Sequence, residues 1–442
     1  MKIWLNYLII SFILTLIGCT SSEVTTHKTK ETEVLRDTVF ITSEQNIEEK
    51  EKTKLGIDVL QENNFDILEN KRVGLITNQT GVNSNLKSTI DILNEAENVE
   101  LTALFSPEHG VRGDVEGGSS IRSYKDEKTG LPVFSLYGKN HKPSKKMLKN
   151  IDVLVYDIQD IGVRSYTFIS TLGLTIEAAS ENGIEFVVLD RPNPLGGNKV
   201  EGNIREEKFT SFISQYPIPY VYGLTCGELA KFLIGEKILN VNKNFNLTII
   251  PMQNWNRNMN WNATGLKWIP TSPHIPHQFS PYFYPMTGIL GELRSAISIG
   301  VGYTLPFQLV GAEWIDNNKL AKYLNDLSLP GLHFRAITYR PYYAFGKLKV
   351  LKGVQLYITD FNNINLTNTQ FYIIVALKKL FPDKNLFSLA KPNEVSMFNK
   401  GIGTNKIFEI INKEGKIDHV IKFLNKDIES FKKKSAKYYL YK

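Results

Sequence analysis

The run Leu104-Phe-Ser-Pro-Glu-His-Gly-Val-Arg-Gly113 decides how we expect this chain to fold. Its proline holds the preceding serine in an extended conformation, so the apolar run Leu101–Phe105 is predicted to be a strand that ends here. The two glycines allow the backbone to turn and a ligand to approach closely. Glu108, His109 and Arg112 bring a carboxylate, an imidazole and a guanidinium into the same turn. The pattern favours a catalytic loop at the carboxyl end of a buried strand over a surface turn whose charges are merely solvated.

Three further runs are apolar almost throughout and are predicted to be strands: Arg72–Thr77, Ile151–Ile158 and Ile184–Leu189. Between the strands lie segments with helical spacing of apolar residues: Leu55–Asn63, Leu86–Leu93 and Thr171–Glu181. Apolar strands that alternate with helices form a parallel sheet that is covered on both faces. We therefore predict an α/β fold with a Rossmann-like, doubly wound, mostly parallel sheet.

Polar side chains follow each of the four predicted strands. They are Asn78 after the first strand along the chain, Glu108, His109 and Arg112 after the second, Asp157, Asp160, Arg164 and Tyr166 after the third, and Asp190, Arg191 and Asn193 after the fourth. Parallel strands end at one edge of their sheet, and ligands bind in the crevice beyond that edge. Loops are polar in general, so one such group carries little weight. Four groups at one rim predict an active site.

The length of 442 residues exceeds that of a usual single domain, and the composition changes after residue 197. The proline-rich run Pro270-Thr-Ser-Pro-His-Ile-Pro-His277 indicates an irregular path, because proline lacks a backbone donor. Regular elements then resume, with helices at Leu320–Leu327 and Gln370–Leu380 and strands at His333–Tyr339 and Val354–Thr359. We expect a Rossmann-like catalytic domain over residues 55–200, with about residue 310 as its outer limit. A connecting region and a smaller α+β domain over residues 201–442 should close over the rim.

The first 54 residues do not belong to this pattern. A basic start, the apolar run Ile9–Ile17 and the ending Leu16-Ile-Gly-Cys19 are typical of a secretory signal. The run is short for a membrane-spanning helix, which needs about 20 residues, and its ending resembles a bacterial lipobox, in which the cysteine is lipidated. We expect residues 1–19 to be a lipoprotein signal peptide and residues 20–54, rich in Thr, Ser, Glu and Lys, to be a flexible tether. Anchored to a membrane through Cys19, the protein should work in the cell envelope.

Cys226 is the only other cysteine of the chain. It follows Thr225, a predicted helix N-cap, and precedes Glu228, which completes the pattern of a capping box. No histidine is near in sequence, so we expect a buried structural thiol and not a nucleophile.

Several kinds of chemistry are disfavoured. The first strand is followed by Asn78-Gln-Thr-Gly81 and not by a glycine-rich dinucleotide fingerprint, and neither a Walker run nor a Gly-x-Ser-x-Gly elbow is present, so no cofactor is expected. His109, His274 and His277 could hold a metal for deacylation or hydrolysis, but a His-x-x-His pair in a proline-rich loop is poor ligand spacing. We expect histidines that orient a substrate instead, and no metal. An exported lipoprotein, although its net charge is +7, has little occasion to meet nucleic acid.

Carboxylate chemistry remains. Glycoside cleavage needs an acid that protonates the leaving oxygen and a second group that activates water or stabilises the oxocarbenium ion. Glu108 suits the first role, and Asp157, Asp160 or Asp190 could supply the second, for which we select Asp160. The three arginines at the rim exceed what a neutral sugar needs, and they suit a substrate that carries a carboxylate. Tryptophan and tyrosine offer flat faces for sugar rings.

Five motifs closely resemble, in the same order, those of the exo-beta-N-acetylmuramidase family of bacterial envelope proteins, formerly a domain-of-unknown-function family. They are Gly74-Leu-Ile-Thr-Asn-Gln-Thr-Gly81, Phe105-Ser-Pro-Glu-His-Gly110, Asp157-Ile-Gln-Asp-Ile-Gly-Val-Arg164, Leu189-Asp-Arg-Pro-Asn-Pro194 and Pro306-Phe-Gln-Leu-Val-Gly-Ala312. The resemblance implies an exo-acting glycoside hydrolase that releases N-acetylmuramic acid from the non-reducing end of peptidoglycan fragments in cell-wall turnover or recycling. It also implies a Rossmann-like domain with a smaller second domain. The glutamate expected to be catalytic in the family falls on Glu108.

The lactyl carboxylate of muramic acid would then account for the arginines. We expect Arg164 or Arg191 to bind it, and the other rim residues and His274 to bind the rest of the substrate. In the alternative, both arginines hold the loop aspartates in place.

The chain departs from the family pattern at one point. Many members carry Glu-Gly-Thr-Asn and then Gly-Arg-Gly-Thr before the Pro-Phe pair, whereas this chain reads Leu290-Gly-Glu-Leu-Arg-Ser295 and Gly300-Val-Gly-Tyr-Thr304. An arginine expected near Val301 is absent, and Glu292 and Arg294 are candidates for a partial replacement. The departure leaves open a second hypothesis, a non-catalytic lipoprotein that binds peptidoglycan fragments.

Overall fold

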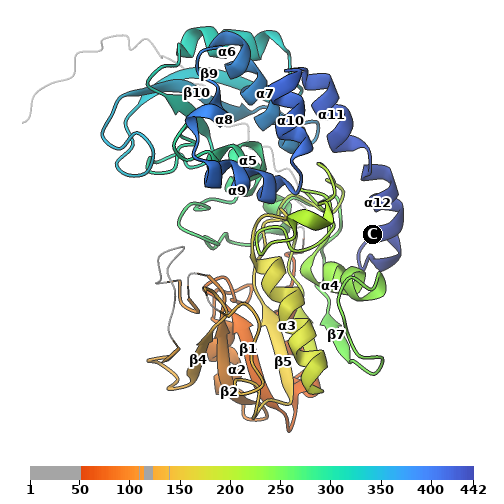
Figure 1. The fold of residues 1–442 in the computed structure, drawn as a ribbon. Coiled ribbons are helices and arrows are strands. Elements are labelled where there is room, and N and C mark those ends of the chain that lie inside the picture. Colours follow the sequence, from red (N-terminus) through yellow and green to blue (C-terminus); the bar gives the residue numbers. More distant parts are fainter. Residues whose placement is uncertain (1–50, 109, 114–122, 139) are drawn as a thin grey trace, which may run out of the picture. The chain divides into compact units, whose positions relative to one another are not determined.

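The central sheet has the strand order β3-β4-β2-β1-β5-β6-β7 in the computed structural model, which describes residues 51–108, 110–113, 123–138 and 140–442 (Figure 1). Its strands are β1 (Arg72–Thr77), β2 (Glu100–Ser106), β3 (Tyr124–Lys125), β4 (Pro132–Ser135), β5 (Val153–Asp157), β6 (Glu185–Leu189) and β7 (Leu247–Ile250). Within the described sheet, β3 pairs antiparallel with β4 and every other neighbouring pair is parallel. The predicted mostly parallel sheet is confirmed.

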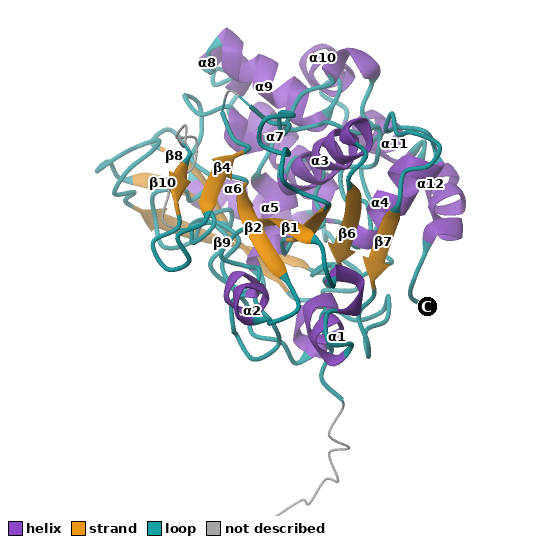
Figure 2. Ribbon diagram, turned by 90° about the horizontal axis from the view of Figure 1, so that it is seen from below, coloured by secondary structure: helices purple, strands orange, loops and turns teal. Residues whose placement is uncertain are grey.

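Helices cover both faces of this sheet (Figure 2). On one face, α1 (Gly56–Glu62) and α2 (Thr89–Glu95) pack in one core cluster with Val73 and Leu75 of β1. On the other face, α3 (Phe168–Asn182) and α4 (Cys226–Gly235) share a core cluster with Ile76 of the same strand. Each fully buried aliphatic side chain contributes about 1.5–3 kcal/mol, so a strand that is apolar on both faces is stable only between two helical layers. The predicted doubly wound arrangement follows.

The four strands expected from the sequence, β1, β2, β5 and β6, are neighbours in the sheet. Three strands were not expected: β3 has two residues, and β4 and β7 have four each. Because β7 pairs with β6, the chain that forms the sheet continues past residue 200, as far as Ile250. The helix at Cys226 begins as predicted, with Thr225 as N-cap and Glu228 completing a capping box.

A smaller antiparallel sheet has the order β8-β10-β9. Its strands are β8 (Leu309–Ala312), β9 (Leu332–Tyr339) and β10 (Leu351–Ile358). Gly353 of β10 lies so close to β8 that an added Cβ would be 1.9 Å from the carbonyl oxygen of Val310. Among the described helices, those that follow α4 are α5 (Ser280–Thr287), α6 (Asn317–Asp326), α7 (Leu366–Leu380), α8 (Leu386–Leu389), α9 (Pro392–Ile402), α10 (Lys406–Lys413), α11 (Ile417–Asn425) and α12 (Ile428–Ser435). Short 3₁₀ turns are η1 (Asp66–Leu68), η2 (Glu207–Phe209), η3 (Trp261–Thr264), η4 (Leu290–Glu292) and η5 (Ala436–Tyr438).

The ends of the described chain pack against the large sheet. Helix α12 returns to it, where the rings of Phe431 and Phe232 lie 5.3 Å apart. The hydroxyl of Tyr441 donates to the carboxylate of Asp190 over 2.7 Å. At the other end Thr53 is fully buried and its N–H donates to the carbonyl of Thr264. Thr53 and Lys54, the last two residues of the expected tether, are therefore part of the folded body, because their backbone pairs with it.

The remaining expectations for the amino terminus concern residues 1–50, including Cys19, which lie outside the described residues. Within the part of the chain that the structure describes, no helix is both long enough and apolar enough to cross a membrane.

Candidate active site

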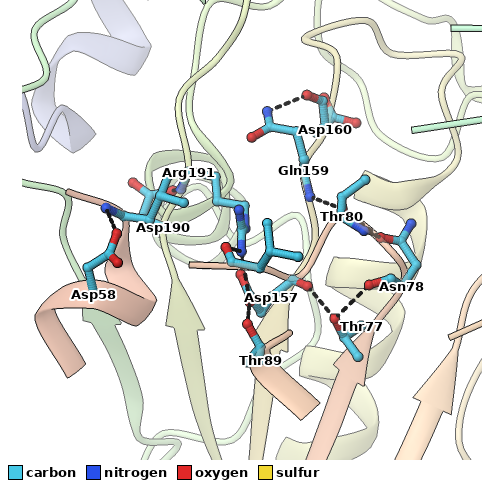
Figure 3. A network of polar contacts seen from close by, with 12 residues as sticks. Asp58, Thr77, Asn78, Thr80, Thr89, Asp157, Gln159, Asp160, Asp190 and Arg191 are labelled. Carbon is cyan, nitrogen blue, oxygen red and sulfur yellow. Dashed lines mark hydrogen bonds and ion pairs between the residues drawn. The ribbon is translucent and has the colours of Figure 1, made fainter. Parts of the chain in front are cut away.

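Several of the predicted rim residues lie in one network of polar contacts at the carboxyl ends of neighbouring strands (Figure 3). At the end of β5, the carboxylate of Asp157 accepts two hydrogen bonds from the guanidinium of Arg191, at 2.5 and 2.9 Å. The hydroxyl of Thr89 donates to the same carboxylate over 2.5 Å. Asp157 and Arg191 are 0% and 4% exposed. This buried pair ties the loop after β6 to β5 and to α2.

The other polar groups of this network also have partners within the protein. The side-chain oxygen of Asn78 accepts from the backbone N–H and the hydroxyl of Thr80. Asp190 accepts from Thr225, the N–H of Gly227 and Tyr441, and burial raises its pKa to about 6. Asn193 bonds backbone groups of its own loop and of Leu224. These contacts fix loops, which differs from the substrate-binding role expected of Asn78, Asp157, Asp190, Arg191 and Asn193.

Arg164 is fully buried and makes no ion pair in the described part of the chain. Its guanidinium donates to the carbonyl oxygens of Asn203, Ile218 and Ile402 over 2.6–2.7 Å. Burial lowers the pKa of Arg164 to about 9. Arg164 thus joins the loop after β5 to the carboxyl end of α9. Neither it nor Arg191 lines the cavity described below. The contacts favour the alternative, in which the arginines hold the loop aspartates, for Arg191 alone, because Arg164 holds backbone carbonyl groups and no aspartate.

Arg112 has a similar structural role. Its guanidinium binds the carboxylate of Asp126 through two bonds of 2.9 Å, and Asp91 lies 3.6 Å away. The bond from Arg112 holds the pKa of Asp126 at about 2, well below its usual value. This pair joins the two ends of the loop between β2 and β4.

Asp160, our selected second catalytic group, is 5% exposed. Its carboxylate accepts from the hydroxyl of Tyr222 and from the N–H of Gly162. Burial raises the pKa of Asp160 to about 6, against the opposing effect of these bonds. Because catalysis requires contact with the substrate and Asp160 does not line the cavity, its position argues against the expected role.

Two adjoining cavities of about 890 and 280 Å³ contain Glu108. They have seven lining residues in common: Glu108, Tyr137, Ser272, Tyr284, Gly288, Glu292 and Arg294. The larger cavity by itself is in the range of small-ligand sites, which are about 300–1,000 Å³. Of the other predicted site residues in the described part of the chain, Tyr166 lines the smaller cavity and His274 the larger. His109 lies outside the described residues.

Glu108 and Tyr137 follow the neighbouring strands β2 and β4, so the sheet itself places them together. Burial and then the nearby Glu108 carboxylate raise the pKa of Tyr137 to about 12. Tyr137 therefore keeps its proton at neutral pH and can donate it in a hydrogen bond to Glu108.

A second carboxyl group reaches the cavity from the other half of the chain. Glu292 closes η4, and burial raises its pKa, against the effect of Arg294. The guanidinium of Arg294 lies 3.2 Å from the Glu292 carboxylate, and the two side chains are 72% and 22% exposed. Glu108 and Glu292 thus give the cavity two carboxyl groups from segments far apart in the sequence.

Aromatic side chains line the cavity walls and mouth. Tyr166 donates to the hydroxyl of Thr271 over 2.7 Å, and its ring meets that of Tyr284 edge to face at 5.6 Å. At the mouth, Tyr343 is 51% exposed, and its hydroxyl lies 2.8 Å from a ring nitrogen of His274. No tryptophan lines these two cavities in the described chain. Trp255 and Trp261 are buried, and the ring of Trp268 packs edge to face on that of Trp261.

Sequence reasoning did not single out Tyr137, because β4 is too short to be predicted. Glu292 and Arg294 were candidates only through the departure from the family pattern. Within the described residues, no three His, Cys, Asp or Glu side chains are arranged to hold a metal ion. Cys226 is buried, as expected, and burial raises the pKa of its thiol.

A doubly wound sheet with two carboxyl groups in one cavity at its carboxyl edge indicates the class of glycoside hydrolases. The comparisons agree with this class. Residues 73–279 match the family model of the N-terminal part of exo-beta-N-acetylmuramidase NamZ, and residues 282–441 match the model of its C-terminal part. The chain therefore belongs to the exo-beta-N-acetylmuramidase NamZ family.

Similar proteins cover almost the whole chain. The sequence is 43% identical over 392 residues to peptidoglycan beta-N-acetylmuramidase NamZ of Bacillus subtilis (strain 168). The aligned region covers 89% of this chain and 92% of that relative. A crystal structure of a DUF1343 family protein from Bacteroides fragilis NCTC 9343 has a TM-score of 0.85 and 53% identity, covering 88% of this chain and 99% of that one. A second from the same organism has a TM-score of 0.70 and 30% identity, covering 89% and 99%.

Proposed function

We propose that this protein is an exo-acting glycoside hydrolase that releases N-acetylmuramic acid from the non-reducing end of peptidoglycan fragments, in cell-wall turnover or recycling. The observation that carries the proposal is the position of Glu108, which lines a saccharide-sized cavity beside Tyr137 and in the same space as Glu292. The family and the relative from Bacillus subtilis support the substrate.

In this mechanism Glu108 protonates the glycosidic oxygen of the leaving sugar. A hydrogen bond from Tyr137 orients its carboxyl group. Glu292, whose side chain lines the same cavity and pairs with Arg294, takes the second role and acts as a carboxylate on water or on the anomeric carbon. Aromatic side chains such as Tyr343 at the mouth offer faces for the sugar that leaves.

The activity can be tested directly. The purified protein should release free N-acetylmuramic acid from the disaccharide in which muramic acid is linked through its anomeric carbon to N-acetylglucosamine. Chromatography with mass detection measures the product, and the reversed disaccharide, with glucosamine at the non-reducing end, serves as control. Equal cleavage of both, or of neither, contradicts the proposal.

We also infer that the protein is a lipoprotein of the cell envelope, held to a membrane through Cys19. The basic start, the short apolar run and the Leu-Ile-Gly-Cys ending support this location. When cells that express the full chain grow with a labelled fatty acid, the parent should carry the label and Cys19→Ala should not. Cys226→Ala is the matched control and should be labelled like the parent. If Cys19→Ala is labelled as strongly as the parent, lipidation at this cysteine is excluded.

A further inference from the structure

Arg294 is the only arginine or lysine among the described residues that line the two cavities. We propose that Arg294 binds the lactyl carboxylate of the substrate and so selects muramic acid over glucosamine at this site. The proposal rests on the proposed function, which supplies a substrate with one carboxylate. It assigns to one residue the role that the sequence suggested for the rim arginines.

The three rim arginines are bound to other groups of the protein. Arg191 is held by Asp157, Arg164 by backbone carbonyl groups and Arg112 by Asp126. Arg294 differs from them, because its side chain is 72% exposed and the described structure gives it one ion-pair partner, Glu292, at 3.2 Å. A single longer contact leaves other N–H groups of the guanidinium available for a carboxylate.

Arg294 is also near the expected point of reaction. Its positive charge lowers the pKa of Tyr137, whereas the carboxylate of Glu108 raises it. Arg294 and Glu108 therefore both lie close enough to Tyr137 to act on its hydroxyl group. The lactyl ether is attached to the third ring carbon of muramic acid, two carbons from the anomeric carbon. If the anomeric carbon of muramic acid lies at Glu108, the lactyl carboxylate of the same sugar lies about one sugar ring away. Both points fit inside the cavity that contains Glu108 and Arg294.

The position of Arg294 explains how the chain can depart from the family pattern. The arginine expected near Val301 is absent, yet Val301 lines the larger cavity that also contains Arg294. The guanidinium of Arg294, which follows η4, lines the same cavity and can bind a carboxylate there. The arriving lactyl carboxylate shares Arg294 with Glu292, so the charge near Glu292 depends on whether a muramic sugar is bound.

The test compares two substrates that differ only in the lactyl group: a β-N-acetylmuramic acid glycoside and the same glycoside of N-acetylglucosamine. Charge-assisted bonds of about 1.5–3 kcal/mol correspond to about 10- to 100-fold in rate, at 1.4 kcal/mol per factor of ten. Arg294→Met should therefore lower kcat/KM for the muramic substrate by that factor, mainly through KM. Loss of the Arg294–Glu292 pair acts on both substrates alike, so the readout is the ratio of the two kcat/KM values, which should fall by the same factor of about 10 to 100. Arg294→Lys should retain part of the preference.

Arg335→Met is the matched control, because Arg335 is exposed on β9 and bonds Gln355, away from the cavities. It should retain the parent's preference ratio. An Arg294→Met variant that also retains this ratio overturns the proposal and leaves the proposed hydrolase intact.

A binding measurement distinguishes failure of the Arg294 proposal from failure of the hydrolase proposal. Calorimetry in the Glu108→Gln background compares N-acetylmuramic acid with N-acetylglucosamine, with and without Arg294→Met. Tighter binding of muramic acid that disappears with Arg294→Met supports the role of Arg294 even if the parent releases no product, in which case the hydrolase proposal alone fails. Equal binding of the two sugars by the Glu108→Gln protein overturns the role of Arg294.

Discussion

Replacing Glu108 with glutamine should lower the release of N-acetylmuramic acid by about two to four orders of magnitude, the usual contribution of a positioned acid or base. Glutamine keeps the size of the side chain and can still bond Tyr137, but it has no proton to give to the leaving oxygen. Affinity for the muramic disaccharide should change little, because the cavity walls remain. Product release followed by chromatography and binding followed by calorimetry measure the two effects separately.

Glu100→Gln provides the matched control. Glu100 is exposed at the opposite end of the same strand, β2, so the same substitution there should leave the rate unchanged. An aryl glycoside of muramic acid, whose leaving group needs no protonation, should recover much of the rate in Glu108→Gln. If Glu108→Gln acts on the disaccharide within a few-fold of the parent, Glu108 is not the acid. If neither protein turns over while both bind fragments, the hypothesis of a binding lipoprotein is favoured.

The sheet and its active edge could be predicted because the signals are local. Runs such as Arg72–Thr77 and Ile184–Leu189 are apolar on both faces, and this pattern has few stable solutions other than a covered parallel sheet. The position of Glu108 follows from the proline that ends β2. The short strand β4 was missed because four residues with proline at the first position give almost no pattern.

The partners of the rim residues could not be predicted from the sequence. A loop aspartate and a loop arginine are equally consistent with binding a ligand and with binding each other. Only the fold decides that Asp157 and Arg191 pair and that Arg164 reaches the carbonyl groups of α9. Glu292 and Arg294 are separated from Glu108 by more than 180 residues of chain, so their place in the same cavity is a property of the tertiary structure.

Replacing Arg191 with methionine should destabilise the protein by about 3–5 kcal/mol, because it leaves the buried carboxylate of Asp157 without its cation. The side chains of this pair are 4% and 0% exposed, so water cannot replace the lost bonds. Chemical denaturation monitored by circular dichroism measures the change. The double variant Arg191→Met/Asp157→Leu should recover part of the loss, because no unpaired charge then remains buried.

The comparison with Arg72 and activity assays decide whether Arg191 is structural. Arg72 makes two similar bonds with Asp152, at the opposite end of β1 and β5, but both side chains are about two-fifths exposed. Arg72→Met should therefore change stability little, since water solvates the carboxylate that remains. At a temperature where Arg191→Met is folded, its preference for muramic over glucosamine substrates should equal that of the parent. If that preference falls while stability is unchanged, Arg191 binds the substrate and is not purely structural. The assignment of Arg294 is then weakened, because one lactyl carboxylate cannot account for two separate arginine sites.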